Sequence, residues 1–162
     1  MTDKNVSIMN IGSMGYLPQV FKKIENEKKL NIVYLGGSIT MGCNATKTEL
    51  RYVDRSAKWW QTNFPDAEIS YFNAGIGATT SQFGVARVQE HVLDKQPDLV
   101  FVEFSVNDSS SPLFMETYES LVRRLLKAES VKAVVLINNL FYNTGTNAQG
   151  IHNAIGLHYD LP

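Results

Sequence analysis

NIVYLGGSIT, which spans Asn31 to Thr40, is the stretch around which the rest of the chain is organised. An apolar run with β-branched residues stops at two glycines, which predicts a buried strand that runs into a tight turn. Gly36 and Gly37 allow this turn without Cβ clashes, so we expect Ser38 at the carboxyl end of the strand with its hydroxyl exposed. In open α/β sheets, ligands bind at this end. Ser38 is therefore a candidate nucleophile, provided that other segments supply a base and an oxyanion hole.

The composition bounds the class of protein. The chain has 162 residues, of which 44% are hydrophobic and 19% charged, and a net charge of −1. These values are typical of one globular domain, so we expect a single domain over 1–162, with an N-terminal extension and helix over 1–27. The absence of a basic face argues against nucleic acid and membrane partners. Residues 1–4 lead into no apolar signal segment, which leaves the compartment unknown, with the cytoplasm as the default.

Apolar strand-like runs alternate with amphipathic helical patterns along the chain. We expect strands at 31–36, 68–73, 99–104 and 131–137, a short edge strand at 6–11, and helices at 18–30, 51–64, about 80–93, 113–129 and 148–159. This alternation is typical of βαβ units with right-handed crossovers. The predicted fold is therefore α/β, with a doubly wound parallel sheet flanked by helices.

Small polar residues follow three of these strands. Ser38 ends the first, residues 75–80 follow the second, and Asn107 and Asp108 follow the third. The carboxyl ends of parallel strands lie along one edge, so these segments can converge. Acyl transfer needs donors aimed at the developing oxyanion. The backbone N–H of Ser38, a backbone N–H from the turn at 77–78 and the Asn107 side-chain amide would supply three.

These segments resemble the first three sequence blocks of the SGNH (GDSL-type) hydrolases. The blocks here are GGSIT at 36–40, NAGIGATTS at 73–81 and VEFSVND at 102–108, and the similarity runs from about Lys28 to the end. The resemblance implies a serine esterase or acylhydrolase on a three-layer flavodoxin-like fold that needs no cofactor. It also implies that Ser38 is the nucleophile, and that the turn at 77–78 and Asn107 give the second and third oxyanion donors.

Two positions depart from the family pattern. The family's aspartate before the serine is Gly37 here, as in a Gly-Gly-Ser branch of the family, and we expect the chemistry to stay intact. The usual glycine of the second block falls on Ala78. An N–H donor does not require glycine, so Ala78 can serve if its backbone angles allow, with Gly77 as the alternative.

The family's base, a histidine in an Asp-x-x-His block near the carboxyl end, has no counterpart in this chain. Its three histidines are His91, His152 and His158, and we expect each to be a helix-surface or packing residue. We therefore expect the C-terminal part of the domain, with its last strand, its histidine and a closing helix, to be absent from residues 1–162. The strand at 131–137 would then present an uncovered edge, prone to self-association.

Other residues have a structural interpretation beside the functional one. Gly37, Asp108 and Asn138 are candidate substrate-binding residues, although Asp108 is also expected to brace its own loop. We expect Glu103, inside an apolar strand, to be a paired structural carboxylate. Trp59 and Trp60 are expected to pack on the inner side of their helix.

The sequence therefore predicts hydrolysis of a carboxylic ester through a Ser38 acyl-enzyme, with a small-molecule or carbohydrate ester, such as an acetylated sugar, as substrate. One alternative is a catalytically silent SGNH-like binding protein. Another is a nucleotide or flavin binder that uses Gly75-Ile76-Gly77, although this segment lacks the third glycine of a dinucleotide fingerprint. No metal site is predicted, because histidines and carboxylates do not cluster at ligand spacing.

Overall fold

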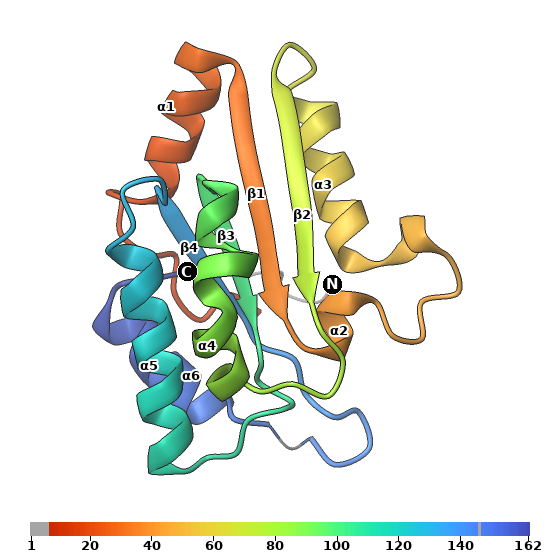
Figure 1. The fold of residues 1–162 in the computed structure, drawn as a ribbon, viewed down its shortest axis with the longest axis vertical. Helices are drawn as coiled ribbons and strands as arrows, with labels where there is room; N and C mark the ends of the chain where they lie inside the picture. The colour runs from red at the N-terminus through yellow and green to blue at the C-terminus, as the bar shows by residue number, and fades with distance from the viewer. Residues whose placement is uncertain (1–6, 146) are drawn as a thin grey trace.

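Four parallel strands form one sheet at the centre of the computed structural model, which describes residues 7–145 and 147–162 (Figure 1). The strand order is β2-β1-β3-β4. The strands are β1 (Lys29–Gly36), β2 (Glu68–Gly75), β3 (Leu99–Glu103) and β4 (Ala133–Ile137). Gly36 at the end of β1 lies opposite Gly75 of β2 and Glu103 of β3. This register brings the segments that follow these three strands to one end of the sheet, as the sequence predicts.

Helices cover both faces of the sheet, which gives three layers (Figure 1). They are α1 (Leu17–Glu27), α2 (Ser38–Met41), α3 (Tyr52–Asn63), α4 (Ser81–His91), α5 (Pro112–Leu126) and α6 (Gln149–His158), with short 3-10 helices η1 (Thr48–Leu50) and η2 (Leu93–Lys95). Successive residues of a strand point to opposite faces. Val33 and Leu35 accordingly pack with α4, α5 and α6, whereas Ile32 and Tyr34 pack with α1 and α3.

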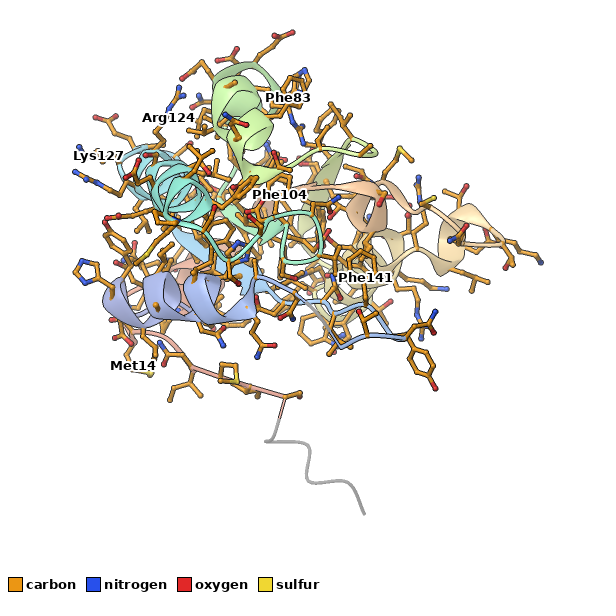
Figure 2. All side chains as sticks on the ribbon, turned by 90° about the horizontal axis from the view of Figure 1, so that it is seen from below. Met14, Phe83, Phe104, Arg124, Lys127 and Phe141 are labelled. Atoms are coloured by element: carbon orange, nitrogen blue, oxygen red, sulfur yellow. The ribbon has the colours of Figure 1, made fainter. Side chains whose placement is uncertain are left out.

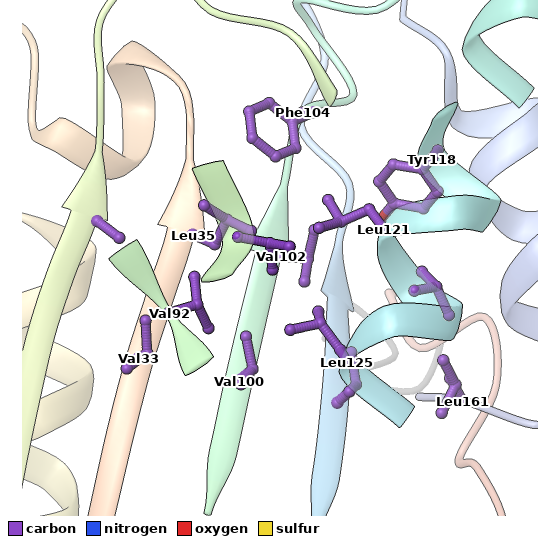
Figure 3. Packing of buried hydrophobic residues seen from close by; sticks show 14 of the residues in the cluster. Val33, Leu35, Val92, Val100, Val102, Phe104, Tyr118, Leu121, Leu125 and Leu161 are labelled. Carbon is purple, nitrogen blue, oxygen red and sulfur yellow. The ribbon is translucent and has the colours of Figure 1, made fainter. Parts of the chain in front are cut away.

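The core between the sheet and α5 is built from aliphatic and aromatic side chains. Figure 3 shows Val100 and Val102 of β3 facing Leu121 and Leu125 of α5, with Tyr118 beyond them. All five side chains are fully buried. Burial of β3 on both faces explains why its sequence is a continuous apolar run.

The predicted order of strands and helices is confirmed, with local differences. Residues 7–11 are irregular where a short edge strand was expected; Val6 lies outside the described residues. Sequence periodicity also misses α2, which is only four residues long. Trp60 is buried as expected, but Trp59 is 52% exposed.

The edge of the sheet at β4 is only partly lined. In the described part of the chain β4 pairs with β3 alone, and the Leu136 N–H donates to the Pro162 carbonyl at 2.8 Å. A groove of about 600 Å³ runs beside β4, between α6 and residues 7–11. No helix in the described ranges is long and apolar enough to cross a membrane.

Candidate active site

Ser38 is the first residue of α2, immediately after β1 and its two glycines. The absence of side chains at the strand ends lets this short helix pack directly on the sheet. A Cβ atom on Gly36 would lie 2.0 Å from the Thr40 hydroxyl oxygen, and one on Gly75 would lie 2.2 Å from the Met41 nitrogen. Because α2 fills the space at Gly75, the turn after β2 offers no cradle for a dinucleotide.

Gly37 allows the third block, residues 102–108, to pack against the turn that carries Ser38 (the serine turn). A Cβ atom on Gly37 would lie 2.5 Å from Asn107 Oδ1 and 3.4 Å from the Thr79 carbonyl oxygen. The Asn107 side chain thus occupies the space that a side chain before Ser38 would need, which explains why glycine can replace the family's aspartate here. The structure brings Ser38 and Asn107 together, as the sequence predicts, and Gly37 acts by making room.

Backbone N–H groups at this end of the sheet are free to donate. Ser38 is at position N1 of α2, where an N–H has no intrahelical partner. The N–H groups of Gly77 and Ala78 have no acceptor among the described residues. Their turn is held close to Gly37, because Ile76 N–H donates to the Gly36 carbonyl at 3.1 Å and Thr79 Oγ1 donates to the Ile76 carbonyl at 2.7 Å.

Ala78 adopts a backbone φ of 55°. This is the left-handed region that favours glycine, which agrees with the place of the family's usual glycine at this position. Ala78 therefore adopts, without being a glycine, the backbone conformation that glycine would adopt freely at this position.

A buried arginine, which the sequence analysis did not single out, ties α4 to the strand ends. Arg87 donates to the Ala74 carbonyl at 2.7 Å and to the Gly36 carbonyl at 3.1 Å. Burial lowers the pKa of its guanidinium. The signal available in the sequence is a lone arginine among the apolar positions of the helix. Its contacts fix the ends of β1 and β2, where the serine turn and the turn at 76–79 begin.

Glu103 is a buried carboxyl group beneath the serine turn. Its Oε2 accepts a hydrogen bond from Thr40 Oγ1 at 3.1 Å, and its side chain is fully buried. Burial raises the pKa of Glu103, and hydrogen bonds such as the one from Thr40 act in the opposite direction. Glu103 is thus a structural carboxyl group held by hydrogen bonds from neutral groups, among them Asn139 and Thr40, and within the described residues no cation pairs with it.

Asp108 braces the loop and does not face substrate. Its side chain has zero exposure, Oδ1 accepts the Ser81 N–H at 2.9 Å and Oδ2 lies 3.1 Å from His152 Nε2. Both oxygens are thus engaged inside the protein, which agrees with the expectation that Asp108 braces its own loop.

Asn138 is also turned to another part of the molecule. Its Nδ2 donates to Asn153 Oδ1 on α6 at 2.7 Å, and it lines the groove beside β4, to which the serine turn does not contribute. The prediction that Asn138 binds substrate is not supported by this placement. The next residue, Asn139, is tied to the third block instead, since its N–H donates to Ser105 Oγ at 2.6 Å.

Most of the chain matches a known protein family. Residues 34–156 match the model of the GDSL-like lipase/acylhydrolase family. The chain belongs to this family. No curated protein matches the chain.

Solved structures of esterases share the fold. A two-domain esterase (CEX) active on acetylated mannans is 49% identical, with a TM-score of 0.93 over 96% of this chain and 42% of that one. The chain thus spans less than half the length of that esterase. AlinE4, an SGNH-hydrolase family esterase, is 22% identical with a TM-score of 0.66, over 82% of this chain and 74% of that one. An acetylxylan esterase from Geobacillus stearothermophilus, Axe2 in its H194A form, is 18% identical with a TM-score of 0.68 and the same coverage.

The three histidines of this family member are engaged elsewhere. His91 Nδ1 lies 3.2 Å from Arg87 Nη1, His152 is buried against Asp108, and His158 is exposed beside Tyr159. The Ser38 hydroxyl makes no hydrogen bond to any residue that the structure describes. Within the same residues, no cluster of three or more histidines, cysteines or carboxylates could hold a metal ion.

Proposed function

We propose that this chain is the nucleophile-bearing part of a serine ester hydrolase. The observation that carries the proposal is the convergence of Ser38 with the Asn107 amide and the free N–H groups of the turn at 77–78. In the proposed reaction, Ser38 Oγ attacks the acyl carbonyl carbon and its proton passes to a base. The carbonyl oxygen becomes an oxyanion, which is stabilised by donors already in place. The C–O bond to the alcohol then breaks, the alcohol leaves with a proton, and water hydrolyses the acyl-enzyme.

The base in this proposal is a histidine outside the described residues. The three histidines of the chain are engaged elsewhere, so none is assigned this role. The groove beside β4 is the proposed place for the segment that brings the base. The hydrogen bond from Leu136 to the Pro162 carbonyl supports this proposal, because it follows the pattern of a strand laid along the open edge. A second copy of the chain could occupy the same edge by self-association.

We propose a carbohydrate that carries small acyl groups, such as acetyl, as the substrate. The relative that is 49% identical is active on acetylated mannans. The structure adds an observation of its own. Leu140, Phe141 and Tyr142 are 55%, 53% and 96% exposed, and their loop lies at the same end of the molecule as α2 (Figures 1 and 2). Exposed aromatic side chains offer apolar faces against which a sugar ring can pack.

The test is hydrolysis of p-nitrophenyl acetate and of acetylated mannan, with Ser38→Ala as the control variant. When a histidine-bearing segment or partner is supplied, the proposal predicts release of acetate that is lost in the control. Acetate release that persists in Ser38→Ala would contradict it. If the chain is inactive alone, a histidine-bearing segment or partner should restore Ser38-dependent turnover.

A catalytically silent binding protein is the second candidate. The observation that favours it is the lack of a base beside Ser38 among the described residues. Binding of manno-oligosaccharides that is equal in wild type and Ser38→Ala, together with no turnover after a histidine-bearing segment is supplied, would establish this alternative.

A further inference from the structure

A carboxylate–imidazole pair with no solvent exposure lies next to the proposed oxyanion hole. Asp108 Oδ2 is 3.1 Å from His152 Nε2, which comes from α6, and both side chains are fully buried. The imidazole ring stacks on the Tyr118 ring of α5, with the ring centroids 3.6 Å apart and the planes 6° from parallel. The orientation of His152 is therefore fixed from two sides, by a hydrogen bond and by a ring contact.

The Asp108 carboxylate connects the two segments that carry the proposed oxyanion donors. Asp108 directly follows Asn107 in the chain. Its Oδ1 accepts the N–H of Ser81, the first residue of α4, which follows the turn at 77–80. The N-cap residue Thr80 makes no side-chain capping hydrogen bond, so Asp108 satisfies a helix N–H that a local cap would otherwise bind. A single side chain thus sets the spacing between Asn107 and the turn with the free N–H groups.

Packing alone does not explain why a histidine occupies position 152. A buried carboxylate without a partner is strongly unfavourable, and an apolar side chain would fill the same space without any demand for hydrogen bonds. His152 supplies the partner for Oδ2 while Oδ1 holds α4. The pair therefore keeps the carboxylate in the one orientation that connects both donor segments.

We propose that His152 is a positioning residue, which acts through Asp108 to hold Asn107 and the turn at 77–80 at the spacing that an oxyanion requires. This inference rests on the proposed function, because it assigns the buried pair a role in the reaction of Ser38. His152 touches no substrate in this proposal and accepts no proton from Ser38.

The test compares three variants of the chain, each assayed together with the histidine-bearing segment or partner that supplies the base. His152→Phe keeps a flat ring against Tyr118 but loses the Nε2 hydrogen bond. His152→Gln keeps a polar N–H group at similar reach. His158→Phe, on the exposed side of the same helix, is the matched control. We expect kcat for p-nitrophenyl acetate to fall about 10-fold in His152→Phe with KM within about twofold, because only transition-state stabilisation is disturbed.

Two further kinetic results follow from the same proposal. His152→Gln should recover most of the lost kcat, and His158→Phe should match wild type. In an Asn107→Ala background, His152→Phe should cost less than the loss of about 10-fold expected in wild type, because one of the two donor segments that it positions is already missing. A full additional loss in that background, or a rise in KM alone, would overturn the positioning role.

Amide hydrogen exchange tests the clamp independently of turnover. We expect exchange at Ser81 and Asn107 to accelerate about 10-fold in His152→Phe, with β1 and β3 unchanged and with His158→Phe like wild type. Unchanged exchange at both residues would overturn the inference whatever the activity. If the wild type shows no Ser38-dependent turnover even when a histidine-bearing segment or partner is supplied, the proposed function fails, while exchange still decides whether the clamp exists.

Discussion

Ala78 adopts a backbone conformation that a residue with a Cβ atom rarely adopts. Its φ of 55° lies in the left-handed region, which costs a residue with a Cβ atom roughly 1–2 kcal/mol, whereas glycine adopts it freely. Replacement of Ala78 by glycine would remove this cost. The larger backbone entropy of glycine in the unfolded chain would offset part of the gain in stability. We expect Ala78→Gly to raise the free energy of unfolding by about 0.5–1 kcal/mol.

Urea unfolding of wild type and Ala78→Gly measures this change. Ala86, an exposed residue inside α4, provides the control, because Ala86→Gly should destabilise by about 1 kcal/mol. A loss of stability in Ala78→Gly comparable to that of Ala86→Gly would contradict the left-handed assignment.

Glu103 makes the stability of the serine turn depend on pH. Burial raises its folded-state pKa above the ordinary value of 4.5. For an acid of this kind, the stabilising contribution is fully present below the unfolded pKa and is lost as pH rises through the folded pKa. We expect the stability of wild type relative to Glu103→Gln to fall as the pH rises from 4.5 through the raised folded-state pKa of Glu103.

The measurement is the difference in unfolding free energy between wild type and Glu103→Gln across that range of pH. The amide keeps an acceptor for Thr40 but carries no proton that titrates, so contributions common to both proteins cancel. A difference that is flat with pH, or that grows in favour of wild type at higher pH, would show that the Glu103 pKa is not raised.

Among the secondary-structure elements and their connections, the loop that follows β4 leads to a prediction about substrate binding. Tyr142 is 96% exposed, and both ends of the loop are held by Ser105, because Ser105 Oγ accepts the Asn139 N–H and the Ser105 carbonyl accepts the Ala148 N–H. A fixed loop with an exposed aromatic tip can contact a sugar ring beyond the acyl group. We expect Tyr142→Ala to raise KM for acetylated mannan several-fold, with KM for p-nitrophenyl acetate unchanged.

Tyr16→Ala is unsuitable as a control for this experiment, because Tyr16 packs against both halves of the core. His158, exposed at the end of α6, is suitable, and His158→Ala should change neither KM. Equal KM increases for both esters in Tyr142→Ala would indicate a general disturbance of the site and would contradict a role in sugar binding.

The sequence predicts the elements well where the pattern is long and local. The apolar runs of β1 and β3 and the three polar segments after the strands identify the sheet and the place of Ser38. The contacts that hold the site cannot be predicted from the sequence, because they join segments that are far apart along the chain. Arg87 reaches the Gly36 carbonyl from α4, and Asp108 caps α4 from the loop after β3. No local pattern distinguishes such side chains from ordinary packing or loop residues.

The same reason applies to two of the predicted substrate-binding residues. Asp108 and Asn138 follow strands at the correct end of the sheet, so they are reasonable substrate-binding candidates in the sequence. Their side chains turn toward α6 and bind His152 and Asn153 instead. The sequence shows which end of the sheet a residue occupies, but the direction of its side chain depends on the partner that packs beside it.

In the whole molecule, the proposed activity depends on how the ends of three strands are arranged. Three strand ends meet, and the segments that follow them place a serine, an amide and free N–H groups together. The chain matches the GDSL-like lipase/acylhydrolase family over residues 34–156, and it shares its fold with solved esterases. The remaining element is the base, which the proposal places outside the described residues, beside the open edge of β4.

Detection of an acyl-enzyme on Ser38 would be the most direct evidence that Ser38 is the nucleophile. The protein is mixed with p-nitrophenyl acetate, quenched in acid and digested, and the acetylated residue is located by mass spectrometry, with Asn107→Ala as the comparison. With a histidine-bearing segment or partner supplied, we expect acetyl on Ser38 in wild type and a markedly lower yield in Asn107→Ala, because that variant loses an oxyanion donor. Acetyl found only on Cys43 or on lysines, at the same yield in both proteins, would contradict this expectation.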